Sequence, residues 1–131
     1  AKAALAENGL DPELVESATG IIRSVTASQI WRRSQQSEHC CTEVPFQVRR
    51  EEADEDPTVL RGAIDLIFKE EDGWVLVDYK TDSLAGKTPG ELVGRYTPQV
   101  RLYASAWEEC TGEAVKETAL YFTQADLLLP V

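Results

Sequence analysis

The chain has 131 residues, which is enough for one domain with one sizeable hydrophobic core. Hydrophobic residues make up 43% of it, which argues against a disordered chain, and no apolar run approaches the roughly 20 residues of a membrane helix. The formal net charge of −10 argues against a broad nucleic-acid-binding surface, because phosphate contacts draw on Lys and Arg. Carboxylates also hold metal ions, so the same charge is compatible with a metal site.

Part of the acidic charge and all of the thiols have plain explanations. One acidic run, which we expect to be a solvated loop, contains Glu51, Glu52, Asp54, Glu55 and Asp56. The three cysteines are an odd number, and the adjacent Cys40 and Cys41 lack the spacing of a zinc site, so we expect reduced thiols in a cytoplasmic protein. No signal peptide is visible. Because the chain begins with Ala1 and has no Met, we expect a fragment of a longer protein.

Two helices are predicted in the first third of the chain. Asp11 and Pro12 fit a helix start, with Asp as the N-cap and Pro at the first helical position. The apolar residues that follow at helical spacing are Leu14, Val15, Ala18, Ile21, Ile22 and Val25. A second, short helix is predicted over 28–37, with Ile30 and Trp31 facing the core.

The centre of the chain is predicted to be an antiparallel meander of three strands. Residues 42–48 form an edge strand, because Pro45 cannot donate a ladder hydrogen bond, and residues 59–68 form the second strand. The Asp-Gly pair at 72–73 is a strong hairpin signal, which folds a third strand, 74–80, back on the second.

A helix and two further strands complete the predicted elements. After a loop at 83–90, apolar residues recur at helical spacing: Leu92, Val93, Tyr96, Val100, Tyr103 and Trp107. Thr97-Pro98 resembles an N-cap followed by a first-position Pro, so we expect the helix to restart or kink there. Gly112 ends it, and strands at 114–122 and 127–131 follow. This order predicts an α/β layer with a mixed sheet.

Three charged residues on the second and third strands carry the strongest chemical signal. Asp65 lies within a very apolar strand, where an uncompensated carboxylate is costly to bury. Strand alternation places Asp65 on the face of Ala63 and Ile67, and it places Asp78 and Lys80 together on one face. Pairing about the predicted turn brings the two aspartates near each other, with a small offset that a bulge could absorb.

Two explanations remain open for these three residues. Facing carboxylates repel unless a cation lies between them, and hard oxygen ligands favour Mg²⁺ or Mn²⁺. A neighbouring ammonium group would then suit the anionic transition state of phosphoryl transfer. A structural ion pair of Lys80 with Asp65 or Asp78 is about equally compatible with the pattern.

Four stretches of the sequence favour the metal site over the structural ion pair. Residues 43–46, 60–66, 77–82 and 96–103 resemble the PD-(D/E)XK nuclease superfamily, and specifically its RecB/AddA-like branch. Gly-x-Ile-Asp, Asp-Tyr-Lys-Thr and Gln-x-x-x-Tyr at matching intervals are a specific combination, whereas Asp-Tyr-Lys alone is weak. The resemblance implies a restriction-endonuclease-like α/β fold, with a central mixed sheet flanked by helices. It also implies one nuclease domain over residues 1–131, belonging to the C-terminal part of a UvrD/Rep-type helicase-nuclease.

The resemblance implies catalytic roles for three side chains and one backbone group. Asp65 and Asp78 match the family's metal-binding aspartates, with Mg²⁺ or Mn²⁺ as the ion. The carbonyl of Tyr79 matches a backbone metal ligand, and Lys80 matches the catalytic lysine.

Supporting roles are implied for further positions. Gln99 and Tyr103 match a motif that supports the site and the DNA, and their i, i+4 spacing puts them on one helix face, where Tyr103 could equally be a packing residue. Glu43 matches a recurrent acidic position, although a solvated Glu on an edge strand is also compatible. Apart from the resemblance, Lys87, Arg95 and Arg101 are expected to contact the DNA backbone, and Arg61 is a further supporting or DNA-binding candidate.

One part of the family pattern has no match in this sequence. The family carries a metal-ligating histidine on an upstream helix, in a Gly-x-x-x-His motif. The only histidine, His39, is expected to be a surface loop residue. Without that ligand the chain is expected to bind metal weakly and to be inactive alone, because metal affinity falls steeply when a ligand is lost.

The resulting hypothesis is metal-dependent hydrolysis of DNA phosphodiester bonds. The resemblance implies an exonuclease or nuclease domain that acts in double-strand break repair and recombination. Its partners would be DNA, a helicase domain in the same polypeptide and a second helicase-nuclease subunit, with no membrane. The sequence has no phosphate-binding Walker motif, so any motor lies elsewhere. The alternative is a catalytically silent nuclease-fold module for DNA-end binding or protein interaction; the intact Asp65, Asp78 and Lys80 argue against it.

Overall fold

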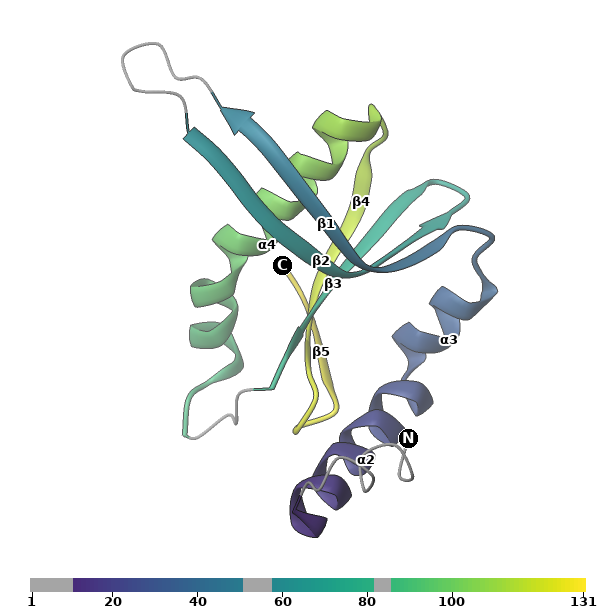
Figure 1. Cartoon of the computed structure of the whole chain (residues 1–131), viewed down its shortest axis with the longest axis vertical. Helices are drawn as coiled ribbons and strands as arrows, with labels where there is room; N and C mark the ends of the chain where they lie inside the picture. The colour runs from purple at the N-terminus through teal and green to yellow at the C-terminus, as the bar shows by residue number, and fades with distance from the viewer. Residues whose placement is uncertain (1–10, 51–57, 82–85) are drawn as a thin grey trace.

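A computed structural model describes residues 11–50, 58–81 and 86–131 (Figure 1). The elements in chain order are α2 (Pro12–Ala27), α3 (Gln29–Gln36), β1 (Cys40–Arg50), β2 (Thr58–Glu70), β3 (Gly73–Lys80), α4 (Pro89–Thr111), β4 (Val115–Phe122) and β5 (Leu127–Pro130). Every predicted helix and strand is present, with ends shifted by a few residues. The predicted acidic loop lies outside the described residues.

The strands form one mixed sheet. Its order is β1-β2-β3-β4-β5, with β3 and β4 parallel and the other neighbours antiparallel. Because β3 and β4 are parallel, a crossover must join them, and α4 is that crossover. Figure 1 shows α4 beside the sheet, and α2 and α3 at the other side of the molecule, with α2 extending away from the strands. The predicted mixed sheet flanked by helices is confirmed.

Two apolar clusters hold the layers together. On the α4 side, Leu76 and Leu120 of the sheet pack with Leu92 and Val100 of the helix. On the other side, sheet residues that include Val77 pack with Ile30 of α3. Strand alternation explains how one strand serves both clusters, because successive side chains point to opposite faces.

Side-chain caps define the first two helices. Asp11 Oδ1 accepts a hydrogen bond from the Glu13 backbone N–H at 2.9 Å, as the predicted N-cap requires. Ser28 ends α2 and caps α3, since its hydroxyl accepts from the Trp31 N–H at 3.2 Å. Ile30 is buried, as predicted, but Trp31 is only half-buried and belongs to neither apolar cluster.

The long helix α4 begins earlier than predicted and does not restart. Its N-cap is Thr88, which forms a reciprocal capping box with Glu91, and Pro89 takes the first position. Thr97-Pro98 carries the same residue types, but Pro98 lies inside one continuous helix. The prediction of a restart is therefore wrong. Gly112, with φ of 72°, ends the helix as predicted.

The β2–β3 hairpin turns one residue earlier than the Asp-Gly signal predicts. Glu70 pairs with Gly73, so the loop consists of Glu71 and Asp72, and Gly73 is the first strand residue. The ladder runs regularly to Leu66, which pairs with Val77. Continued by one step, the same register sets Asp65 opposite Asp78. The predicted offset between these aspartates, and the bulge to absorb it, are therefore wrong.

Candidate active site

Strands β2 and β3 separate from each other at Asp65 and Asp78. We call this point, with Asp65, Asp78 and Lys80, the fork. The β2–β3 ladder ends at Leu66 and Val77, whereas β3 stays paired with β4 as far as Lys80, and β2 stays paired with β1. Figure 1 shows the resulting divergence of β2 from β3. Beyond the ladder, the Tyr79 backbone N–H donates to Asp65 Oδ2 at 2.7 Å. The Asp65 carboxylate thus bridges the base of the fork, and it satisfies a donor that a continued ladder would pair with β2.

Strand alternation breaks at the same point. Ile64 and Ile67 both belong to the cluster on the α4 side, although an odd spacing of three should put them on opposite faces. Leu66 belongs to the other cluster, so the break falls at Asp65. The prediction of one regular alternation from Ala63 through Ile67 is therefore wrong.

Glu43 lies at the matching position of β1. The β1–β2 register places Glu43 opposite Asp65, between the Thr42–Leu66 and Val44–Ile64 pairs, although it is not itself a ladder pair. Its φ is 52°, in the left-handed region that a residue with a side chain seldom adopts. Such strained positions cluster at functional sites. The Glu43 side chain is exposed, so its carboxylate is open to solvent beside the fork.

Asp78 and Lys80 form the centre of the candidate site, on the α4 face of β3. The Asp78 residue is only 3% exposed. Lys80 Nζ lies 2.6 Å from Asp78 Oδ2, an ion-pair contact with angles outside hydrogen-bond geometry. Asp78 Oδ2 therefore has no hydrogen bond within the described part of the chain. The Lys80 ammonium group is thus the cation that this buried oxygen contacts, and the oxygen still has room for a well-aligned donor or a metal ion.

The surroundings of Asp78 disfavour the ionised form of its carboxyl group. Burial raises the pKa of the Asp78 carboxyl above its usual range, the ammonium group of Lys80 counteracts the shift, and the nearby Asp65 charge adds to it. Burial, followed by the Asp65 charge, also raises the pKa of Tyr79 to about 12. Each shift has the sign that a negative, poorly solvated site produces. A divalent cation bound at the fork would lower these pKa values instead of raising them.

Helix α4 holds the Lys80 ammonium group from the other side. Nζ donates to Gln99 Oε1 at 2.8 Å, and it lies 4.3 Å from the centre of the Tyr96 ring. Gln99 Nε2 donates in turn to the Tyr103 hydroxyl at 2.9 Å. The structure therefore links Lys80, Gln99 and Tyr103 in one chain of contacts; the motif spacing predicted only that Gln99 and Tyr103 share a helix face.

Tyr96 is a site residue that the sequence reasoning missed. It lies within a matched stretch, but only its apolar helical spacing was used. Positions 96, 99 and 103 share one helix face, so the same spacing that groups Gln99 with Tyr103 would have included Tyr96.

The donor set at the fork fits magnesium. Mg²⁺ is usually bound through one or two carboxylates while it keeps several waters, and the fork offers Asp65 and Asp78, one oxygen of which has no hydrogen bond within the described residues. No group of three acidic, histidine or cysteine residues able to hold a metal occurs within residues 11–50, 58–81 and 86–131. His39 is exposed and lies against Trp74, with ring centres 6.5 Å apart, as expected of a surface residue.

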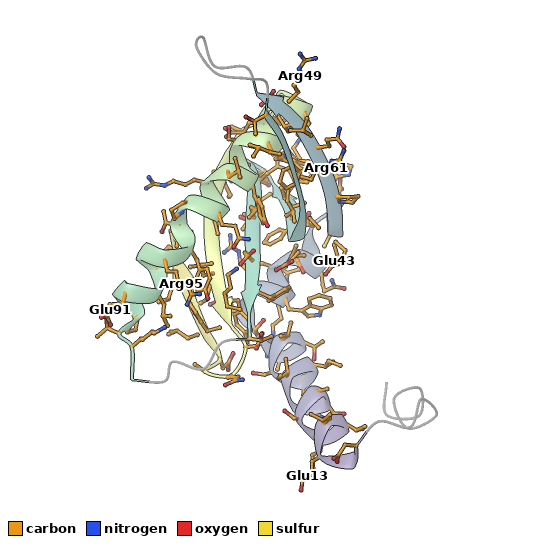
Figure 2. All side chains as sticks on the ribbon, turned by 60° about the vertical axis from the view of Figure 1, so that its left-hand side comes forward. Glu13, Glu43, Arg49, Arg61, Glu91 and Arg95 are labelled. Atoms are coloured by element: carbon orange, nitrogen blue, oxygen red, sulfur yellow. The ribbon has the colours of Figure 1, made fainter. Side chains whose placement is uncertain are left out.

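The remaining candidates lie around the fork without direct contacts to it. Figure 2 shows Glu43 and Arg61 on the β1–β2 arm and Arg95 on α4. Arg61 and Arg101 are both exposed, as DNA-contacting residues must be. The Tyr79 side chain points away from Lys80, since it packs edge-on against Tyr121 on the other face of the sheet.

A cleft among the described residues lies away from the fork. It has a volume of about 590 Å³ and lies between α3 and the β2–β3 hairpin, where Arg33, His39 and Lys69 line it. This is the opposite end of β2 and β3 from the aspartates. We place the candidate site at the fork, because the carboxylate there is buried, whereas the carboxylates that line the cleft, Glu38, Glu70 and Glu71, are exposed or half-buried.

Comparison with known proteins decides the family. The model of the PD-(D/E)XK nuclease superfamily matches residues 2–128. The chain belongs to this superfamily. Among solved structures, the crystal structure of SSO0001 aligns with a TM-score of 0.54 at 13% identity, covering 92% of this chain and 51% of that one. At this identity the likeness supports the fold alone, and the restriction-endonuclease-like fold predicted from sequence is confirmed.

Curated relatives place this nuclease domain in larger proteins. The chain is 35% identical over 116 residues to an ATP-dependent helicase/nuclease (AddA) of Alkaliphilus metalliredigens, which covers 82% of this chain and 10% of the relative. It is 38% identical over 101 residues to the protein of the same name from Lysinibacillus sphaericus, which covers 72% of this chain and 8% of the relative. The chain thus spans about a tenth of these relatives. In its described residues, no helix is long and apolar enough to cross a membrane.

Proposed function

We propose that this nuclease-superfamily chain hydrolyses DNA phosphodiester bonds with a divalent metal ion. The observation that supports it most is the fork: a buried Asp78 carboxylate lies against Lys80 and next to Asp65. The ion pair with Lys80 only partly compensates this carboxylate, because burial still raises the pKa of Asp78 above its usual range.

Each residue of the fork has a distinct task in this proposal. Asp65 and Asp78, with the Tyr79 carbonyl, would hold Mg²⁺ or Mn²⁺. When bound, the ion would polarise the phosphate and acidify a water molecule. Lys80 would neutralise the charge that develops on the phosphate or orient the attacking water, because its ammonium group is held between Asp78 and α4.

DNA would approach along the exposed arginines near the fork. Arg61 lies on β2, on the side of Asp65 away from the hairpin, and Arg101 lies on α4 just after Gln99. Phosphate contacts of this kind position a duplex without reading its sequence. Since the chain carries a net charge of −10, most of the affinity for DNA would come from other parts of a larger protein.

The larger protein is proposed from the relatives. We propose that the chain serves as the nuclease domain of a helicase-nuclease, with a motor in the same polypeptide and a second helicase-nuclease subunit, and that it acts as an exonuclease in double-strand break repair. The name that these relatives share, an ATP-dependent helicase/nuclease, supports the motor. We also propose a cytoplasmic location, which the free thiols of Cys40, Cys41 and Cys110 support.

Metal binding and cleavage test the proposal together. Mn²⁺ titration by calorimetry and cleavage of end-labelled linear DNA would compare the wild type with Asp78→Asn and with Asp72→Asn. Asp72 is the matched control, because it is an exposed aspartate at the other end of β3. Asp78→Asn should abolish measurable binding and lower cleavage at least about 100-fold, since even outer-shell partners of a metal contribute roughly 10–100-fold. Asp72→Asn should change neither.

The alternative, a silent nuclease-fold module, makes the opposite prediction. It expects DNA or protein binding without cleavage at any Mg²⁺ or Mn²⁺ concentration. Weak cleavage has a separate explanation, because the family resemblance implies a histidine ligand that this sequence lacks. Extending the chain with a relative's histidine-bearing helix should then raise both Mn²⁺ affinity and cleavage; equal activity with and without the helix would reject a missing ligand.

A further inference from the structure

The contacts that hold Lys80 extend beyond α4 to the β1–β2 arm. The Tyr103 ring, whose hydroxyl accepts from Gln99, packs edge-on against Phe46 of β1, with ring centres 5.2 Å apart at 71°. Phe46 pairs with Gly62 of β2 in the ladder. A continuous path therefore runs from Gly62 through Phe46, Tyr103 and Gln99 to the Lys80 ammonium group.

Gly62 is required for space rather than for backbone conformation. A Cβ at this position would lie 2.8 Å from Phe46 Cε1 and Cζ and 3.2 Å from Tyr103 Cε1. Real Cβ atoms essentially never come within 3.0 Å of a neighbour, so the rings would have to move. The φ of Gly62 is outside the left-handed region, unlike those of Gly73, Gly86 and Gly112. Alanine could adopt the Gly62 backbone, and its effect would come from the methyl group alone.

The direction of the Gln99 amide depends on this packing. Its Nε2 donates to the Tyr103 hydroxyl, which leaves Oε1 free to accept from Lys80 Nζ. If Tyr103 moved away, Nε2 would lose its acceptor, and the Gln99 side chain would be held less firmly in the position where Oε1 accepts from Lys80. Lys80 would then lose its hydrogen bond to α4 and keep the ion pair with Asp78 and the contact with the Tyr96 ring.

We infer that Gly62 is a positioning residue for Lys80, because its missing side chain lets Phe46 and Tyr103 pack so that Gln99 accepts a hydrogen bond from the ammonium group and fixes its position beside Asp78. The inference rests on the proposed function for what Lys80 does in catalysis. It adds that the β1–β2 arm, and not only the fork, sets the position of that group.

The test compares Gly62→Ala with Gly20→Ala. Gly20 lies on α2, and a Cβ there would meet nothing within 4 Å, so the same exchange serves as the control. Gly62→Ala should lower kcat for linear DNA about tenfold, the loss of roughly one hydrogen bond to a charged group, with KM and Mn²⁺ affinity unchanged. In a Tyr103→Phe background, which lacks the hydroxyl, Gly62→Ala should cause little further loss.

A second readout does not depend on cleavage. The side-chain ¹³Cε and ¹⁵Nζ resonances of Lys80, assigned by their disappearance in Lys80→Arg, should shift in Gly62→Ala and stay unchanged in Gly20→Ala. Phe46→Leu should shift them in the same way, because it removes the ring that supports Tyr103 without adding any atom. If Gly62→Ala does not fold, the Lys80 resonances of Phe46→Leu test the inference in its place.

The outcomes separate this inference from the proposed function. If the wild type does not cleave DNA even when extended with the histidine-bearing helix, the proposed function fails for this chain, and the Lys80 resonances alone decide the inference. Unmoved resonances in both Gly62→Ala and Phe46→Leu would overturn it. So would an equal loss of kcat with and without the Tyr103 hydroxyl, because a simple loss of stability would act in both backgrounds.

Discussion

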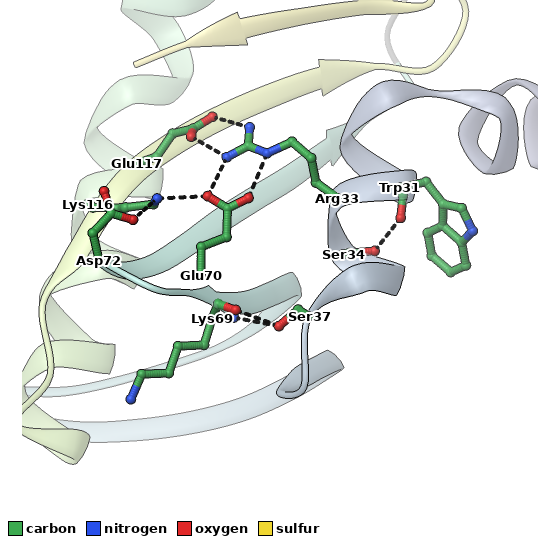
Figure 3. Close-up of polar contacts among 9 residues, drawn as sticks. All are labelled: Trp31, Arg33, Ser34, Ser37, Lys69, Glu70, Asp72, Lys116 and Glu117. Carbon is green, nitrogen blue, oxygen red and sulfur yellow. Dashed lines mark hydrogen bonds and ion pairs between the residues drawn. The ribbon is translucent and has the colours of Figure 1, made fainter.

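The two ends of the β2–β3 pair each carry a cluster of charges, and the clusters behave in opposite ways. At the hairpin end, Arg33 makes paired hydrogen bonds to Glu70 and to Glu117, at 2.7–3.0 Å, and Lys116 contacts Glu70 and Asp72 (Figure 3). At the fork end, the Lys80 ammonium group contacts Asp78 alone, the charge of Asp65 acts on the same carboxyl, and a buried Asp78 oxygen has no hydrogen bond within the described residues.

The carboxyl pKa values separate the two clusters. Hydrogen bonds from Arg33 and then Lys116 lower the pKa of Glu70 to about 2, so the anion is the favoured form there. Burial raises the pKa of Asp78, so the anion is disfavoured at the fork. Both clusters hold one more acid than base, and the difference is solvation and hydrogen bonding. A cluster already satisfied by protein donors has no use for a metal ion, whereas the fork does.

Removing the Lys80 ammonium group should have the largest effect of the changes that distinguish the fork from the hairpin cluster. Lys80→Met should lower DNA cleavage by roughly 100-fold or more, the usual effect of losing an electrostatic stabiliser of the transition state. It should also destabilise the metal-free protein by about 3 kcal/mol, because a buried Asp78 loses its partner. Cleavage assays and urea unfolding measure the two effects.

Magnesium provides the control for Lys80→Met. Added Mg²⁺ should restore much of the lost stability, since a ligand that binds only the folded state stabilises it, but it should not restore cleavage. A variant that unfolds as the wild type does in metal-free buffer would show that Lys80 does not compensate the Asp78 charge.

The raised pKa of Asp78 predicts a stability gain from its removal. A carboxyl whose pKa is higher in the folded protein than its unfolded value of 3.8 stabilises the fold while protonated, and this contribution is lost as pH rises through the folded pKa. Asp78→Asn should therefore unfold at higher urea than the wild type at pH 7 without metal. The gap should close as pH falls below 3.8. A variant less stable than the wild type at pH 7 would contradict a strained anion.

Much of this arrangement could be predicted from local sequence signals. Spacing of i and i+2 on a strand was enough to put Asp78 and Lys80 on one face, and i and i+4 on a helix was enough to group Gln99 with Tyr103. The order of the elements followed from periodicity and turn residues. These properties depend on a few neighbouring residues, so they are visible without the fold.

The features that could not be predicted depend on contacts between distant segments. The left-handed backbone at Glu43 has no sequence signal, because glutamate seldom adopts it. The break in strand alternation at Asp65, opposite Glu43, was not predicted either. The hairpin register differs from the predicted one because the turn lies one residue earlier in the chain. The space at Gly62 is defined by Phe46 and by Tyr103, which comes from a helix much later in the chain.

The hairpin cluster should respond to acid and leave cleavage unchanged. The pKa of Glu70 falls from 4.5 to about 2 on folding, so its stabilising contribution is present above pH 4.5 and is lost as pH falls from 4.5 towards 2. Glu70→Gln should lower stability at pH 7 and flatten the acid limb of the unfolding profile, while DNA cleavage stays at the wild-type rate. Reduced cleavage would show that the two clusters are coupled.

The smallest predicted effect concerns DNA affinity, and it compares the two faces of the sheet. Arg101, exposed on α4, should contribute about one phosphate contact, so Arg101→Ala should weaken binding a few-fold and reduce the slope of log affinity against log salt by about 0.9. Arg32→Ala is the matched control, because Arg32 is an exposed arginine on α3, across the sheet from α4. Equal slopes for the two variants in fluorescence anisotropy titrations would mean that DNA does not approach from the α4 side, and the ammonium group of Lys80 would then face no phosphate.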